Sequence, residues 1–187
     1  MSQIDDILML SCIRNMRLSS IITIAIVFLA LNFYGQGPDI LDYKSISILG
    51  VTWESTEKDL IKTFGNPDTL FNPKYECGAY STDQQDINSV TLFRYSNIDF
   101  LIVDNRVVFQ DIYFDKESNF ELKADNCTLS NNTTIDQLKE LFPNSYKNWL
   151  TDEHRIFRLW PCQQCDGEIW LHIKNDHIEK VQFWEPC

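Results

Sequence analysis

The chain carries two closely similar helical patterns, and this internal repetition is the feature that most constrains its fold. The first, STEKDLIKTFGNPD, covers residues 55–68, and the second, TTIDQLKELFPNSY, covers residues 133–146. A constant offset aligns Thr56 with Thr134, Leu60 with Leu138, Phe64 with Phe142 and Asn66 with Asn144. Repetition at a fixed period indicates that one structural unit occurs twice. The sequence therefore predicts two tandem repeats, residues 41–118 and 119–187.

The first predicted repeat combines an extended stretch, a helix and a run of strands. Ile46 and Ile48 alternate with serines at strand period within residues 41–53. Ser55 or Thr56 then caps a helix over residues 55–64, and Gly65 and Pro67 end it. Strand-like runs follow at residues 89–96, 98–104 and 106–114, with a hairpin turn at Asp104 and Asn105.

The second predicted repeat follows the same order. An extended stretch over residues 119–129 leads to a helix over residues 133–142, where Thr134 and Gln137 form a capping box and Pro143 ends the helix. Strand-like runs follow at residues 154–160, 167–174 and 177–184, with a turn at Asn175 and Asp176. We expect an α+β fold in which each repeat packs its helix on one face of an antiparallel sheet and leaves the other face open.

The first helix also carries a resemblance to known families. Thr56, Leu60, Phe64, Gly65 and Pro67 form a string that resembles the helix signature of the SmpA/OmlA (BamE-like) outer-membrane assembly lipoproteins. Duplication of such a unit is similar to the beta-lactamase inhibitor protein family, which has two tandem helix-and-sheet repeats. The resemblance implies a fold and no function, because the chain lacks the lipobox cysteine and matches none of the inhibitor's contact residues.

The N-terminus predicts export. Arg14 and Arg17 precede an apolar run that closes at residues 35–38, which is the order of a bacterial secretory signal peptide over residues 1–36. Met16 is an alternative start, because the residues from Met16 onward form a complete signal. An uncleaved anchor is the other alternative, because the residues before Gln36 make a poor cleavage site. We expect a periplasmic or secreted protein with no membrane contact after cleavage.

The charge narrows the class of partner. The formal net charge is −11, and residues 1–36 contain two acidic and two basic side chains, so residues 37–187 keep the whole of it. Nucleic acids and anionic membranes require clustered Lys and Arg, and this charge disfavours both. The expected partner is a protein of unknown identity.

Five cysteines follow the predicted signal, and export to an oxidising compartment makes each a disulfide candidate. They are Cys77, Cys127, Cys162, Cys165 and Cys187. Cys162 and Cys165 have the spacing of a redox dithiol, but strand-like segments flank them instead of a helix N-terminus, which favours a structural disulfide. Redox catalysis and a zinc half-site are the alternatives, and zinc lacks a second ligand pair.

No sequence motif supports an enzyme. The three histidines accompany no GxSxG, HExxH or glycine-rich phosphate loop. We therefore expect a non-catalytic protein that binds no cofactor and no metal.

The aromatic residues give the best functional prediction. Alternation along residues 169–173 places Ile169 and Leu171 on one side of a strand and Trp170 and His172 on the other. The expected open face consists of Arg94, Phe100, Arg158, Trp170, His172 and Trp184. Trp, Phe and Arg are typical of interface hot spots, although the same aromatics would also suit a seam between the repeats.

Three functions follow in order. The first is a secreted or periplasmic protein-binding protein that uses the open sheet face. The second is an inhibitor or immunity-type protein that masks one cognate enzyme, which the duplicated fold and the acidic charge would suit. The third is a redox enzyme that acts through Cys162 and Cys165.

Overall fold

The computed structural model describes residues 37–75, 78–81, 87, 89–115, 118–125 and 127–186. The predicted signal segment, residues 1–36, lies outside the described residues, so export stays a prediction. Among the described helices, none is long and apolar enough to cross a membrane.

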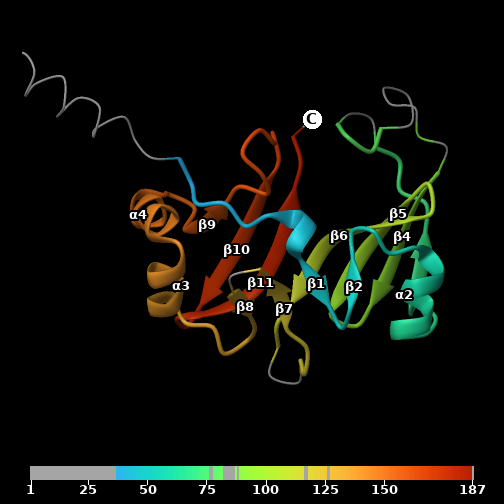
Figure 1. Cartoon of the computed structure of the whole chain (residues 1–187), viewed down its shortest axis with the longest axis horizontal. Helices are drawn as coiled ribbons and strands as arrows, with labels where there is room; N and C mark the ends of the chain where they lie inside the picture. The colour runs from blue at the N-terminus through green and yellow to red at the C-terminus, as the bar shows by residue number, and fades with distance from the viewer. Residues whose placement is uncertain are drawn as a thin grey trace, which may run out of the picture. The chain divides into compact units, whose positions relative to one another are not determined.

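The described chain is mostly β-structure with helices, and the predicted α+β class is confirmed (Figure 1). The helical elements are η1 (Tyr43–Ser45), α2 (Glu57–Phe64), α3 (Ile135–Leu141) and α4 (Pro143–Thr151). The strands are β1 (Ser47–Ile48), β2 (Val51–Thr52), β3 (Thr69–Phe71), β4 (Val90–Tyr95), β5 (Ile98–Val103), β6 (Arg106–Tyr113), β7 (Leu122–Ala124), β8 (Cys127–Leu129), β9 (Ile156–Leu159), β10 (Glu168–Lys174) and β11 (His177–Trp184).

The larger sheet has seven strands in the order β3-β4-β5-β6-β11-β10-β9, and every pairing in it is antiparallel. The meanders β4–β5–β6 and β9–β10–β11 match the six predicted strand-like runs. They meet where β6 pairs with β11, over the residue pairs Tyr113↔Lys180, Ile112↔Val181 and Asp111↔Gln182. One continuous sheet therefore contains both meanders.

The smaller sheet corrects the predicted extended stretches. Residues 41–53 and 119–129 each fold back into a short hairpin, and the four strands pair in the order β2-β1-β7-β8. Leu49 and Gly50 form the first reversal with φ angles of 51° and 86°, a left-handed conformation that glycine adopts readily. The serine and isoleucine alternation could not reveal this reversal, because it looks the same in one long strand and in two short ones.

The two predicted helices form, and their caps are as predicted. Thr56 and Asp59 make a reciprocal capping box at α2, and Thr134 and Gln137 make one at α3. Each threonine hydroxyl accepts a hydrogen bond from a backbone N–H that the helix itself leaves unpaired. Gly65 ends α2 with a φ of 80°.

Pro143 was expected to end the second helical region, and instead it begins α4. Proline suits the first turn of a helix because the backbone N–H it lacks would have no intrahelical partner there. Asp39 caps α4 from far away in the chain: its Oδ2 accepts hydrogen bonds from the N–H groups of Asn144 (2.8 Å) and Ser145 (2.9 Å). A sequence separation of 105 residues hides this cap from any local pattern.

The core lies on one side of the larger sheet. Figure 1 shows α2 near one end of that sheet and α3 with α4 near the other, with the smaller sheet between them. Leu60 of α2, Leu138 of α3 and Leu122 of β7 are fully buried in a single cluster with the inward side chains of the larger sheet. The helices and the smaller sheet thus share one buried face.

Phe64 and Phe142 were expected to be buried equally, and they differ. Phe142 is 6% exposed in the core, whereas Phe64 is half-buried and packs at its edge against Tyr95 and Phe100, with ring centroids 5.3 and 5.5 Å away. Phe142 is more enclosed because it joins α3 to α4 and both helices surround it.

Phe142→Ala should lower the free energy of unfolding by about 3–5 kcal/mol, because it removes a buried aromatic ring and leaves a cavity. Chemical denaturation measures the change. Leu141→Ala is the matched control, since Leu141 precedes Phe142 in α3 but is 41% exposed. Equal costs for the two variants would contradict the packing described for this helix.

Candidate binding face of the larger sheet

The two sides of β10 differ sharply in burial. Ile169 and Leu171 are 0% exposed in the core, while Trp170 and His172 between them point to the opposite side and are partly exposed. We call the side opposite the core the outer face. The predicted residues Arg94, Arg158, Trp170, His172 and Trp184 all lie on it.

Strand register brings three of these residues into one row across the sheet. Direct pairings connect neighbouring members of the row from β4 to β9. In order they are Arg94, Asp99, Asp111, Gln182, Trp170 and Arg158. Trp184 and His172 stand on either side of Trp170, since Trp184 pairs with Glu168 and His172 pairs with Lys180.

Phe100 does not belong to the outer face, and its inclusion in the predicted site was wrong. It is 0% exposed in the core and pairs directly with Phe93, whereas Arg94 pairs with Asp99. Directly paired residues in a sheet point to the same side, so Arg94 and Phe100 must point to opposite sides. The prediction lacked the register of β4 against β5, which decides this.

Trp170 and Trp184 form a stacked pair on the outer face. Their ring centroids are 5.2 Å apart and the rings are nearly parallel, at 10°. The indole Nε1 of Trp170 donates a short hydrogen bond to Oε2 of Glu168. Stacking and the hydrogen bond hold the two large rings in one arrangement while leaving part of each accessible.

Arg158 completes this aromatic group. Its guanidinium carbon lies 5.6 Å from the ring centroid of Trp170, within the range of a cation–π interaction. Two carboxylates hold the guanidinium there, Asp152 at 3.2 Å and Glu168 at 3.6 Å. Partial burial alone would raise the pKa of Asp152, but the N–H groups of Ile156 and His154 and the charge of Arg158 lower it, so the carboxylate stays ionised.

A charged group that the sequence analysis missed occupies the middle of the row. Asp99 is buried and receives a bidentate hydrogen bond from Arg94, with Nη2 2.7 Å from Oδ2. Asp111 pairs with Asp99 across the strands and contacts Lys180 at 3.0 Å. Like charges on paired residues repel, and the two cations offset that repulsion. Alternation in the predicted strands would have placed both aspartates opposite the core.

His172 and Lys180 extend the polar part of the face. The Nε2 atom of His172 lies 3.2 Å from Oε1 of Gln182, within hydrogen-bond distance. Nζ of Lys180 lies 5.2 Å from the ring centroid of Tyr113, an exposed residue of β6. The outer face therefore presents aromatic rings, amides and charges of both signs side by side.

The two halves of the outer face are not equally accessible. Over β4 and β5, a second apolar cluster of Val90, Leu92 and Leu101 is covered by Tyr75, Tyr80 and Ile87 from the segment between β3 and β4. Over β9 to β11, the Trp170 and Trp184 side chains remain partly accessible. The predicted open face is therefore confined mainly to the second meander.

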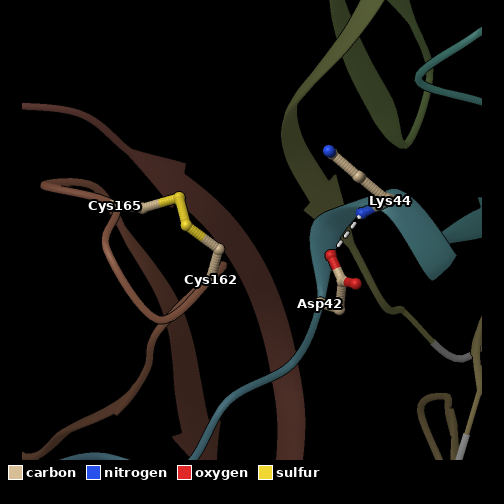
Figure 2. Close-up of a disulfide and its surroundings, with 4 residues drawn as sticks. All are labelled: Asp42, Lys44, Cys162 and Cys165. Atoms are coloured by element: carbon tan, nitrogen blue, oxygen red, sulfur yellow. Dashed lines mark hydrogen bonds between the residues drawn. A yellow bond between two sulfur atoms is a disulfide. The ribbon is translucent and has the colours of Figure 1, made fainter.

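The predicted disulfide between Cys162 and Cys165 is confirmed. It closes the loop between β9 and β10, and Figure 2 shows it together with the turn at Asp42 and Lys44, where the Lys44 N–H donates to Oδ1 of Asp42 at 3.0 Å. The N–H of Tyr43 donates to the carbonyl oxygen of Pro161 at 3.0 Å, which joins the two segments.

The other cysteines have different outcomes. Cys127 is a free, half-buried thiol whose pKa is raised by burial, which disfavours the reactive thiolate. Cys77 and Cys187 lie outside the described residues. Within the described ranges, no group of three or more His, Cys, Asp or Glu side chains is placed to hold a metal ion.

Comparison with known proteins adds no relative. Scans against protein-family models, curated proteins and solved structures found no match to this chain.

Trp170→Ala and Leu171→Ala provide a matched test of the outer face, because the two residues are adjacent in β10 and point to opposite sides. We expect Trp170→Ala to lower the free energy of unfolding by only about 1–2 kcal/mol, from lost stacking and partial burial. Leu171→Ala should cost roughly 3–5 kcal/mol, as for a fully buried leucine. Thermal or chemical denaturation distinguishes the two, and equal costs would assign Trp170 to the core.

Proposed function

We propose that this chain is an exported, non-catalytic protein that binds another protein through the outer face around Trp170 and Trp184. The observation that carries the proposal is the stacked tryptophan pair on the sheet side opposite the core. A chain that needed these rings only for stability would gain more by burying them, since burial of apolar area is the main stabilising contribution to folding.

The arrangement of this group also suits binding. Trp and Arg dominate the few residues that carry most of the affinity in protein interfaces. Here Trp170 is held by Trp184, Glu168 and Arg158 before any partner arrives. Side chains that are already ordered lose little conformational entropy on binding, which favours affinity.

We further propose that the fold arose from two tandem repeats, residues 41–118 and 119–187, as in the beta-lactamase inhibitor protein family. Corresponding contacts support this proposal. The N–H of Val107 donates to the carbonyl oxygen of Ser55 (3.0 Å), and the N–H of Ile178 donates to that of Thr133 (3.3 Å). Both meanders also turn through two consecutive residues with positive φ. The helix α4 interrupts the correspondence, because the first half has no helix directly after α2.

Export is part of the same proposal. The basic and apolar order of residues 14–38 is typical of a secretory signal, and the Cys162–Cys165 disulfide suits an oxidising compartment such as the periplasm.

Mass spectrometry of the protein recovered from its native host should find an N-terminus near Gln36 on a species in the envelope or medium. The physical reason is that a short apolar segment with basic residues before it directs export and is then removed. An intact N-terminus on a cytoplasmic species would contradict this part of the proposal.

Affinity capture from the envelope fraction tests the binding face. Wild-type protein should retain a partner that Trp170→Ala loses, because removal of a central aromatic costs more than about 2 kcal/mol of binding, roughly thirtyfold in affinity. Leu141→Ala is the control, since it truncates an exposed apolar side chain on α3, among the elements that pack on the other side of the sheet. Equal retention by both variants would contradict a binding role for the face.

The captured partner also separates the two candidate functions. An enzyme whose activity falls when this chain is added would favour the inhibitor or immunity-type role, which the rigid face and the net charge of −11 also suit. A partner without enzymatic activity would favour a binding role in envelope assembly.

A further inference from the structure

A cavity of about 690 Å³ lies at one end of the larger sheet, beside the tryptophan pair. It is bounded by the start of β6, the start of β10, the end of β11 and the residues that follow it. The side chains that matter for its chemistry are Tyr43, Trp53, Tyr80, Arg106, Trp184 and Glu185.

The cavity exists because β6 and β11 separate. The two strands pair only as far as Asp111 and Gln182, although β6 begins at Arg106 and β11 continues to Trp184. Phe109 and Phe183 stack across the gap with ring centroids 5.7 Å apart. An opening between two strands at the centre of a sheet is a place where a partner's side chain can enter.

One wall of the cavity already attracts a cation. Tyr43 and Trp53 meet edge to face with centroids 5.9 Å apart. The ammonium group of Lys44 lies 5.6 Å from the Trp53 ring and 6.0 Å from the Tyr43 ring. Lys44 itself is exposed at the surface and does not line the cavity. The aromatic faces on this side therefore suit a positive charge.

The opposite side supplies negative charge. Glu185 accepts a hydrogen bond from the Tyr80 hydroxyl at 3.1 Å, and among the described residues it has no ion-pair partner. Partial burial raises the pKa of Glu185, and the hydrogen bond from Tyr80 opposes that shift. Asp166 and Glu168 also line the cavity, against Arg106 as the basic residue of the lining. A cation placed there would meet acidic groups that are not neutralised.

We infer that this cavity binds a basic side chain, a lysine ammonium or an arginine guanidinium, presented by the partner protein. The inference rests on the proposed binding function and names the chemistry of the partner. Aromatic rings and carboxylates together are the lining that recognises such groups. The volume is within the usual range for binding sites, roughly 300–1,000 Å³, so one basic side chain and part of its neighbours fit. The net charge of −11 draws a basic surface toward the face.

The test uses the full chain and three blocked tripeptides: acetyl-Gly-Lys-Gly-amide, its arginine equivalent and its norleucine equivalent. Norleucine has the carbon chain of lysine without the charge. We expect the lysine and arginine peptides to shift the indole N–H signals of Trp53 and Trp184 in NMR titrations, and the norleucine peptide to bind at least about fivefold more weakly. Equal binding of the norleucine peptide would overturn the inference.

Two pairs of variants locate the binding. Glu185→Gln should weaken lysine-peptide binding by about fivefold or more, whereas Glu140→Gln, the same change at an exposed residue of α3, should not. Lys44→Ala removes the cation from the Tyr43 and Trp53 rings, so it should tighten binding by about twofold or more, whereas Lys58→Ala on α2 should not. Equal effects within either pair would show general charge attraction and overturn the assigned site.

The outcomes separate this inference from the proposed function. The cavity inference fails alone if no basic peptide binds while Trp170→Ala still abolishes partner capture. The face proposal fails alone if Trp170→Ala keeps the partner while the basic peptides bind with the expected variant pattern.

Discussion

The antiparallel pairing of β6 with β11 is the interaction on which the rest of the structure depends. It spans only the pairs from Tyr113↔Lys180 to Asp111↔Gln182, yet it joins two three-stranded meanders into one sheet. A sheet of this width can bury one continuous side against α2, α3, α4 and the smaller sheet. A single apolar core forms as a result, and the other side is left to polar and aromatic groups.

The shortness of the same pairing creates the two candidate binding features. Where β6 and β11 pair, the outer face carries the row from Arg94 to Arg158, with the buried Asp99 and its neighbour Asp111 balanced by Arg94 and Lys180. Where the strands separate, the cavity opens beside Trp184. The aromatic pair lies between the two, so a partner that covered the tryptophans would also reach the mouth of the cavity.

Asymmetry between the two halves gives the outer face its direction. The segment that includes Tyr75 and Tyr80 covers the apolar side chains of β4 and β5, whereas Trp170 and Trp184 on the second meander remain partly accessible. Tyr80 serves both purposes, because its ring packs beside the covered cluster and its hydroxyl binds Glu185 at the cavity. Burial, and to a smaller extent the adjacent Glu185 charge, raise the pKa of Tyr80, so the phenol stays protonated and keeps donating that hydrogen bond.

The sequence by itself determined the features that depend on neighbouring residues. The capping boxes at Thr56 and Thr134, the six strands of the two meanders and their tight turns follow from local propensity, and all could be predicted. Only the tertiary structure decided which residues meet across long separations. Asp39 caps α4 and turns the expected stop at Pro143 into a start, and the pairing of Phe93 with Phe100 removes Phe100 from the binding face. Register and long-range hydrogen bonds depend on how distant segments pack, and no local pattern encodes them.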